Sequence, residues 1–269
     1  MKWIISDIHG CFNTLLALIE KVKKEDENAE FIFVGDFVDR GDKSKEVLEY
    51  LIPKLKSGEY MAVQGNHEGI MYDGIYHPFG SNWGSNGGGA TIKSYNNNKE
   101  LMEEHIDFIT TLPYYLIFDD VDEKGRKLLV THSFFSDYID EYLSLYGGTE
   151  DEIYSAVQKY EEEFGIFARC KITKMADLIN WNRNITTKGS KNYFNVCGHN
   201  ITGHLLEKYD NINGYNEKTE VIIDNELGYA CIDTGAFIDW QYENIMFGGK
   251  LTAISFPNKD IIQQENIDG

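Results

Sequence analysis

Residues 31–41 read FIFVGDFVDRG, an apolar run that ends abruptly in a turn rich in aspartate and glycine. The same pattern occurs in KWIISDIHG at 2–10, in YMAVQGNHE at 60–68 and in LLVTHS at 128–133. Short apolar runs with many β-branched and aromatic residues predict buried strands, and the polar turns mark where those strands end. The sequence therefore predicts several strands that each deliver polar side chains at their carboxyl end.

Helical periodicity separates the first three runs, with apolar residues three and four apart between 14 and 24 and between 47 and 52. Strand–helix–strand units of this kind predict a parallel sheet. From about residue 194 the pattern changes to short strands with glycines, in the segments FNVCGHN, EVIID, YACIDTGA and GGKLTAISF. These predict a second sheet packed on the first, so we expect an α/β fold, a two-sheet α/β/β/α sandwich.

The length of 269 residues is sufficient to bury a core as one domain, 1–269, without disulfide or metal staples. Two segments fit the strand pattern poorly, and we expect insertions near the sheet edge at about 74–98 and 137–170. The glycines at 87–89 in the first of them leave open a flexible tip or a substrate-contacting loop.

The charge balance limits the partners of the chain. Lys and Arg total 25 against 44 Asp and Glu, a formal net charge of −19, which disfavours nonspecific nucleic-acid binding. No signal peptide and no apolar stretch of ~20 residues is present, so we expect no membrane partner. The four cysteines lack C-x-x-C spacing and predict buried, free thiols in a reducing cytoplasmic compartment.

The side chains after the predicted strands are those that hard or borderline divalent metals prefer. Asp7 and His9 alternate along an extended segment and so point the same way. Asp36 follows the next strand, where one carboxylate can bridge two ions ~3.5–4 Å apart. A single histidine at a strand end is more often structural, but here several strands supply ligand-type side chains to one edge. The residues that would complete a second ion are Asn66, His132 and His199.

Two arginines are candidate phosphate ligands, because a guanidinium offers a rigid fork of donors to phosphate oxygens. They are Arg40 and Arg183, and for Arg183 a surface ion pair is an equally good interpretation of the spacing. His67 could donate a proton to a leaving oxygen, with Asp39 orienting its ring and raising its pKa. The alternative for Asp39 is a helix N-cap.

These motifs together resemble one family. DIHG at 7–10, GDFVDRG at 35–41, GNHE at 65–68, His132 and GHN at 198–200 resemble the calcineurin-like metallophosphoesterases, in the phosphoprotein-phosphatase-type branch. The resemblance runs from residue 1 to about 256, leaving the two insertions outside. It implies two divalent ions, expected to be Mn²⁺ with Fe or Zn as alternatives.

The resemblance also implies roles, position by position. It assigns Asp7 and His9 to the first metal, Asp36 to the bridge, and Asn66, His132 and His199 to the second metal. It assigns His67 as the general acid, Asp39 as its partner, and Arg40, Arg183 and Asn66 to phosphate binding. The implied reaction is attack of a metal-bridging hydroxide on phosphorus with no phosphoenzyme.

Within the branch, the chain is similar to lambda-phage-type Ser/Thr protein phosphatases and to symmetrical diadenosine tetraphosphatases. The segments that carry this likeness are DTG at 233–235, GGKLTA at 248–253 and WGSNGG at 83–88. We expect a Ser/Thr protein phosphatase acting on a phosphorylated protein or a small phosphoester, of unknown oligomeric state. The alternatives are a diadenosine tetraphosphatase, with Trp83 or Tyr95 stacking on a base, and an inactive module that binds a phosphorylated partner.

Three features depart from the family pattern. Gln64 stands where many relatives carry arginine, which would remove one positive charge near the phosphate. The segment 237–247 is longer than the expected link, and its aromatic residues could cover the cleft or pack on its edge. His204 has no secure counterpart, and we leave it outside the metal set.

Overall fold

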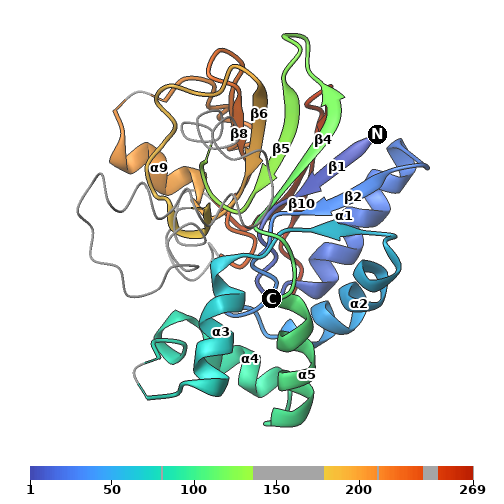
Figure 1. Ribbon diagram of the computed structural model, residues 1–269, viewed down its shortest axis with the longest axis vertical. Coiled ribbons are helices and arrows are strands. Elements are labelled where there is room, and N and C mark those ends of the chain that lie inside the picture. Colours follow the sequence, from blue (N-terminus) through green and yellow to red (C-terminus); the bar gives the residue numbers. More distant parts are fainter. Residues whose placement is uncertain (80, 136–178, 211, 239–247, 269) are drawn as a thin grey trace, which may run out of the picture.

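The computed structural model describes residues 1–79, 81–135, 179–210, 212–238 and 248–268. Within these ranges two mixed sheets pack on one another, and helices lie outside them (Figure 1). The predicted insertion at 137–170 and most of the predicted link at 237–247 lie outside the described residues.

The first sheet has the strand order β10–β9–β1–β2–β3. Its strands are β1 (Lys2–Ile5), β2 (Glu30–Phe33), β3 (Met61–Ala62), β9 (Lys250–Phe256) and β10 (Ile261–Glu265). β1, β2 and β3 run parallel, whereas β9 is antiparallel to both β1 and β10.

The second sheet has the order β4–β5–β6–β8–β7. Its strands are β4 (Tyr115–Val121), β5 (Lys127–Thr131), β6 (Tyr193–Cys197), β7 (Ile222–Asp224) and β8 (Tyr229–Cys231). The central strands β5, β6 and β8 run parallel, so their carboxyl ends meet at one edge.

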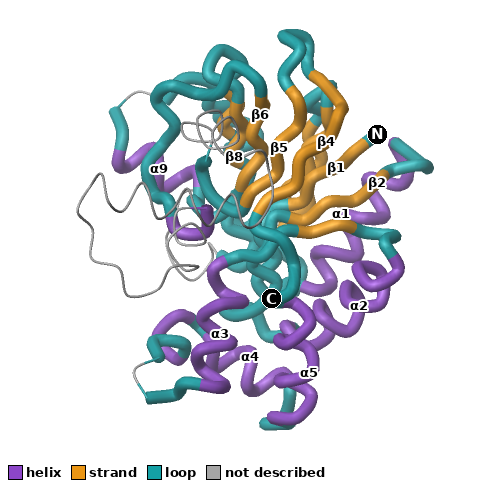
Figure 2. Tube along the Cα trace, viewed as in Figure 1, coloured by secondary structure: helices purple, strands orange, loops and turns teal. Residues whose placement is uncertain are grey.

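The helices flank the sheets, as the purple and orange segments of Figure 2 show. They are α1 (Phe12–Glu25), α2 (Ser44–Ser57), α3 (Asn66–Tyr76), α4 (Gly88–Ser94), α5 (Lys99–Ile109) and α9 (Thr202–Lys208), with a 3-10 turn at Gly84–Asn86. Apolar residues of α1 and α2 at helical spacing are buried against the first sheet. Leu205 of α9 packs on the outer face of the second sheet.

Side-chain alternation along the strands assigns each residue to a layer. Ile4 and Ile32 point between the sheets, where they meet Val130 and Val196 of the second sheet. Their neighbours Trp3 and Ile5 point to the opposite face and join the helical core. One strand thus serves two cores, and the predicted α/β/β/α sandwich is confirmed.

Two details of the sequence prediction were wrong. The segment GGKLTAISF, which contains β9, does not belong to the second sheet but pairs with β1 in the first. Conversely, the run at 128–131 lies in β5 of the second sheet. Local patterning reports a strand but not its partner, because pairing depends on contacts about 250 residues apart.

The segment 74–98, predicted as an insertion near the sheet edge, contains helical structure. Its described part contains the end of α3, the 3-10 turn and α4, and Trp83 and Tyr95 are buried in the core that also holds α2 and α5 residues. Gly87 and Gly88 are packed rather than forming a free tip, since a Cβ would meet Arg40 at the first and the Trp83 indole at the second.

Asp268 caps the first turn of α1 from the other end of the chain. Its carboxylate accepts hydrogen bonds from the backbone N–H groups of Asn13 and Thr14, at 3.0 and 2.9 Å, and from the Thr14 hydroxyl. The N-cap residue itself, Cys11, makes no side-chain capping bond. A remote carboxylate therefore performs the role that a neighbouring serine or aspartate usually has.

Two further expectations concern cysteines and membranes. Cys11, Cys197 and Cys231 are buried and free, while Cys170 lies outside the described residues. None of the described helices has the length and apolar character needed to cross a bilayer.

Candidate metal centre and active site

The carboxyl ends of strands from both sheets converge on one pocket of about 340 Å³. The strand-end residues brought together are Asp7 and His9 after β1, Asp36 after β2, Asn66 and His67 after β3, His132 after β5 and His199 after β6. The pocket lining includes Asp36, Arg40, Asn66, His67, Arg183 and His199. Residues nearly 200 positions apart thus share one polar site.

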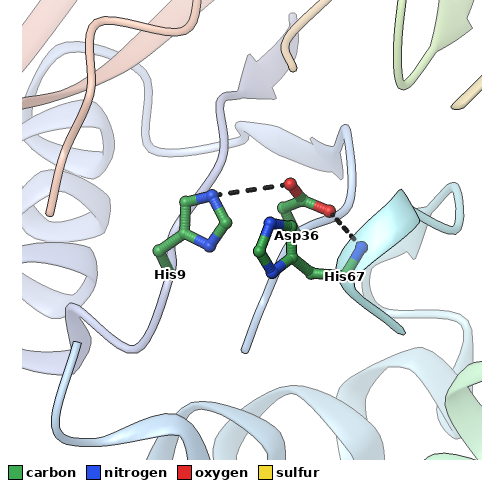
Figure 3. A group of neighbouring side chains, drawn as sticks. All are labelled: His9, Asp36 and His67. Atoms are coloured by element: carbon green, nitrogen blue, oxygen red, sulfur yellow. Dashed lines mark hydrogen bonds and ion pairs between the residues drawn. The ribbon is translucent and has the colours of Figure 1, made fainter. Parts of the chain in front are cut away.

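Asp36 lies at the centre of the site and faces histidines on both sides. Its Oδ2 is 3.4 Å from His9 Nε2, and its Oδ1 is 3.4 Å from His132 Nε2. Oδ1 also accepts a 2.9 Å hydrogen bond from the backbone N–H of His67 (Figure 3). Each oxygen therefore belongs to a different group of potential ligands, which is the arrangement a bridging carboxylate needs.

Among the described residues, two groups of side chains have potential ligand atoms within 4.8 Å of one another. The first is His9, Asp36 and His67, and the second is Asp36, His132 and His199. The second group agrees with the predicted ligand set. The first places His67 where the sequence prediction had Asp7, so the roles of these two residues remain predictions.

Hydrogen bonds from one ring nitrogen to the backbone determine which other nitrogen of His9 and His132 can bind a metal. His9 Nδ1 donates to the carbonyl of Val38, and His132 Nδ1 donates to that of Val34, both at 2.8 Å. A carbonyl only accepts, so each neutral ring carries its lone pair on Nε2, directed into the site.

The donor set around Asn66 fits a cation. Asn66 Oδ1 lies 2.8 Å from His132 Nε2 and 2.9 Å from His199 Nδ1. His199 Nε2 is buried and has no hydrogen-bond partner among the described residues. A buried site rich in acceptors and lone pairs is unfavourable without a positive charge, which a divalent ion supplies.

The electrostatics of the site keep these groups in ligating forms. Burial lowers the pKa of His9, His132 and His199, so the rings stay neutral. Burial raises the pKa of Asp36, but attraction to the neighbouring histidine rings when they are protonated outweighs burial and holds that pKa below its ordinary value, and His67 is the ring whose own pKa is raised. A charged carboxylate among neutral imidazoles is the combination that borderline divalent metals prefer.

Asp7 is buried and outside the described pocket lining, and a second aspartate, Asp233, influences its charge. The Asp7 carboxylate accepts the backbone N–H of His199 at 3.0 Å. Burial, then Asp233 and then Asp36, raise the pKa of Asp7 well above its ordinary value, and burial raises that of Asp233 to about 6. Neighbouring buried carboxylates repel one another, and a bound cation would relieve that repulsion.

His67 and Asp39 form the predicted pair. His67 Nδ1 lies 2.8 Å from Asp39 Oδ2, and Asp39 Oδ1 accepts hydrogen bonds of 2.8 Å from both the Trp83 indole and the Thr91 hydroxyl. Burial lowers the pKa of His67, yet the carboxylates of Asp36 and Asp39 outweigh it and the pKa is raised. Asp39 is no helix cap, because α2 begins at Ser44 and its N-cap residue is Lys43.

Arg40 contacts both histidines of the first group. Its guanidinium donates to His9 Nε2 at 2.9 Å and lies 3.1 Å from His67 Nε2. The guanidinium also lies 4.4 Å from the centroid of the Phe237 ring, a cation–π arrangement. Arg183 is exposed and lines the same pocket. Both arginines are thus placed where an anion in the pocket could meet them.

The backbone at the site is strained. Left-handed φ angles occur at His9 (46°), Asp36 (50°), Asp39 (69°), Arg40 (69°) and His199 (64°). Non-glycine residues pay of order 1 kcal/mol or more for such angles, so the surrounding structure must hold them. Strain that gathers at candidate ligands is typical of a functional site.

Glu68 provides part of that support. Its buried carboxylate accepts the backbone N–H groups of Asp36, Phe37 and Gly65 at 2.8–3.0 Å. These bonds join the turn after β2 to the start of α3, and so fix Asp36 relative to His67. Burial raises the pKa of Glu68 to about 7.

Several sequence interpretations change with this geometry. Trp83 and Tyr95 are 6% and 2% exposed, and their polar atoms bond Asp39 and His105, so the idea that they stack on a base was wrong. Gln64 is buried and outside the described pocket lining.

The sequence prediction omitted four residues that build or line the site, namely Glu68, Asp233, His204 and Phe237. Asp233 follows β8 directly, the same strand-end position that identified the other candidates. The strand-end position could therefore have identified Asp233 from the sequence. Phe237 begins the segment whose aromatic residues were expected to cover the cleft or pack on its edge, and His204 was considered only as a metal ligand.

Comparisons with known proteins agree with this geometry. Residues 3–166 match the model of the calcineurin-like phosphoesterase family. An asymmetrical bis(5'-nucleosyl)-tetraphosphatase, PrpE, of Bacillus subtilis is 29% identical over 168 residues, which is 56% of this chain and 67% of that protein. Serine/threonine-protein phosphatase 2 of Salmonella typhimurium is 25% identical over 140 residues, 52% of this chain and 61% of that protein.

A solved serine/threonine phosphatase from Saccharomyces cerevisiae shares the fold. It aligns with 99% of this chain and 80% of its own at a TM-score of 0.55 and 15% identity. The family model covers more than half of the chain and includes the turns that carry Asp7, Asp36 and His67. The chain belongs to the calcineurin-like phosphoesterase family.

Proposed function

We propose that this protein is a dinuclear-metal phosphomonoesterase of the Ser/Thr protein phosphatase type. The observation that carries the proposal is the position of Asp36, with one carboxylate oxygen facing His9 and the other facing His132. His9, His132 and His199, whose pKa values are lowered, supply neutral imidazoles beside the carboxylate of Asp36, a donor set that suits Mn²⁺, Fe or Zn. Two bound ions would supply Lewis-acid charge to the phosphate and activate a water molecule.

The residues of the chain itself would do the remaining work. Arg40, and Arg183 at the rim, would bind phosphate oxygens through charge-assisted hydrogen bonds and hold the phosphoryl group in line. His67, oriented by Asp39, would donate its proton to the leaving oxygen. The raised pKa of His67 supports this role, because it keeps the ring protonated nearer neutral pH.

A dinucleoside tetraphosphatase is the second candidate. The relative from Bacillus subtilis carries that name and supports the alternative. Against it, the two aromatic residues that could have gripped a base are buried in the core. We therefore keep the phosphatase as the leading proposal.

One comparison separates the two candidates. It measures kcat/KM in Mn²⁺ for a phosphothreonine peptide and for diadenosine tetraphosphate on a single preparation. A preference for the peptide of tenfold or more, about 1.4 kcal/mol in transition-state stabilisation, supports the phosphatase. A preference for the dinucleotide moves the substrate class to nucleotides and leaves the metal centre unchanged.

An inactive module that binds a phosphorylated partner is the third candidate. The hydrogen-bonded pair of His67 and Asp39 argues against it, because binding alone does not need an oriented proton donor. The test is metal content after reconstitution with Mn²⁺. Well under one equivalent of metal, together with no turnover of p-nitrophenyl phosphate, would favour the inactive module.

A further inference from the structure

The pocket beside Asp36 extends to a second wall, formed by α9 and the residues around Arg183. Its described lining on this side is Arg183, Asn200, Ile201, His204, Leu205 and Lys208. Neither His204 nor Lys208 belongs to the groups that surround Asp36. This wall is therefore a part of the pocket that the metal centre does not account for.

Helical spacing places four of these residues on one face of α9. Ile201, His204, Leu205 and Lys208 are separated by three, one and three positions, which puts them along a single stripe. Leu205 is 4% exposed and packs into the outer core, whereas His204 and Lys208 are exposed. The buried leucine fixes the helix so that its two basic side chains lie at the pocket.

Lys208 is held in place at this wall. Its Nζ donates a 3.0 Å hydrogen bond to the backbone carbonyl of Arg183 and lies 5.1 Å from the centroid of the Tyr209 ring. An ammonium has three donors, and this bond uses one of them. The contact joins the end of α9 to the segment that carries Arg183, so the two cationic side chains come to the same wall.

The charge of the pocket is opposite to that of the protein. The chain carries a formal net charge of −19, yet the described pocket lining contains Arg40, Arg183 and Lys208 and a single carboxylate, Asp36. Exposed lysines on an acidic protein are ordinarily solvated and have no ligand. Here a lysine and a histidine share one pocket with an arginine, and local positive charge can attract an anion that the whole surface repels.

We propose that His204 and Lys208, next to Arg183, form a second anion subsite. It would bind a second phosphate or carboxylate group of the same substrate molecule, beside the phosphoryl group that reacts near Asp36. The proposal rests on the proposed phosphoesterase function for the first site. A neighbouring phosphorylated or acidic residue of a phosphopeptide would supply the second group, as would the next phosphate of a polyphosphate chain.

The experiment compares substrates that differ in the number of anionic groups. The substrates are p-nitrophenyl phosphate, a phosphothreonine peptide with neutral neighbours, the same peptide with a second phosphothreonine, and diadenosine tetraphosphate. The variants are Lys208→Gln, His204→Gln and the double variant. The matched control is Lys24→Gln, which removes one charge from an exposed position on α1.

The double variant is expected to raise KM about tenfold for the substrates with a second anionic group, because charge-assisted hydrogen bonds are lost. Its kcat and KM for p-nitrophenyl phosphate should stay within about twofold of wild type. The single variant Lys208→Arg should keep the KM of wild type, since the guanidinium keeps the charge and the donors. If KM of the double variant rises only for the doubly phosphorylated peptide, a phosphopeptide supplies the second anionic group. If it rises only for diadenosine tetraphosphate, a polyphosphate chain supplies that group.

Two results would overturn the proposal. One is an unchanged KM for every substrate that carries a second anion, and the other is an equal loss for p-nitrophenyl phosphate. A calorimetric titration with inorganic pyrophosphate and inorganic phosphate separates this proposal from the proposed function. If wild type binds pyrophosphate more tightly than the double variant does, the second anion subsite is supported even if no substrate is hydrolysed. Equal binding of pyrophosphate by the two proteins would reject the subsite.

Discussion

The indole N–H of Trp83 donates a 2.8 Å hydrogen bond to one oxygen of Asp39, whose other oxygen lies 2.8 Å from the His67 ring. Trp83 comes from a segment that looks dispensable in the sequence, yet it reaches the candidate proton donor through one intermediate side chain. Thr91, on α4, makes a second bond to the same oxygen. The segment around α4 is thus a support for the acid–base pair.

Trp83→Phe should lower kcat about tenfold, because the hydrogen bond that it removes is made to a charged group and is worth ~1.5 kcal/mol. KM should change little, since Trp83 does not line the pocket. The measurement is steady-state kinetics with p-nitrophenyl phosphate. Trp3→Phe is the matched control, because that buried indole also donates to an aspartate, Asp26, away from the pocket. Equal kcat losses in both variants would show a general stability effect.

Asp36→Asn and His67→Asn should separate metal binding from proton transfer. Asp36→Asn should abolish turnover with loss of both ions, since each oxygen of Asp36 faces a different ligand group. His67→Asn should keep the metals and slow turnover ~10²- to 10⁴-fold, the usual contribution of a general acid. Metal analysis by mass spectrometry checks this. Comparable metal loss in both variants would make His67 a ligand, as its position in the first group permits.

Asp39→Asn should shift the pH dependence of kcat. The pKa of His67 is raised above its ordinary value, with Asp39 among the causes, so the acid form persists to higher pH and activity falls as pH rises through that pKa. Without the carboxylate the falling limb should move to lower pH. A pH profile between 5 and 9 measures it. An unmoved limb would mean that another group limits the rate at high pH.

Arg40→Ala should weaken phosphate binding. Each charge-assisted hydrogen bond is worth ~1.5–3 kcal/mol, so KM should rise by at least about tenfold. Arg40→Lys should recover part of the loss, because the charge remains but the planar fork does not. Inhibition by inorganic phosphate gives an independent affinity. Unchanged KM and kcat in the alanine variant would remove Arg40 from the site.

Asp268→Asn keeps an oxygen that can accept from the helix N-terminus but removes the negative charge there and the ion pair with Lys43, so it should destabilise the fold by ~0.3–1 kcal/mol at pH 7. Burial raises the pKa of Asp268, but the N–H groups of Thr14 and Asn13 and the ammonium of Lys43 outweigh it, and the pKa is lowered. A lowered folded-state pKa gives stability that is present above the unfolded value of ~3.9 and is lost as pH falls.

The difference between wild type and Asp268→Asn should therefore shrink below about pH 4. Urea unfolding at pH 7 and near pH 3.5 measures it, with exposed Glu217→Gln as the control. A difference that is equal at both pH values would mean that the charge of Asp268 does not contribute.

The fold and the centre of the site were predictable because their signals are local. Asp36 and His132 each directly follow an apolar run, and parallel strands deliver such positions to one edge whatever the order of the strands. The pairing of His67 with Asp39 followed from the same placement together with the family resemblance, and the structure puts the two side chains within hydrogen-bond distance.

The parts that escaped prediction depend on contacts between distant segments. No pattern near Trp83 indicates that its indole will meet Asp39, 44 positions away. The sheet that β9 joins is likewise decided by pairing with β1, and its own alternation fits either sheet equally well. Lys208 reads as an ordinary surface lysine until α9 is placed beside Arg183.

The position of β9 beside β1 constrains how the protein is made. β1 holds the turn with Asp7 and His9, but one of its edges pairs with Lys250–Phe256, which leave the ribosome roughly 12–50 s later at ordinary rates of synthesis. During that interval this edge of β1 stays unpaired, and an unpaired strand edge is a site at which chains can aggregate. If the candidate ligands bind metal, the ions would be expected to bind after β9 has been made, because β1 carries the turn with Asp7 and His9.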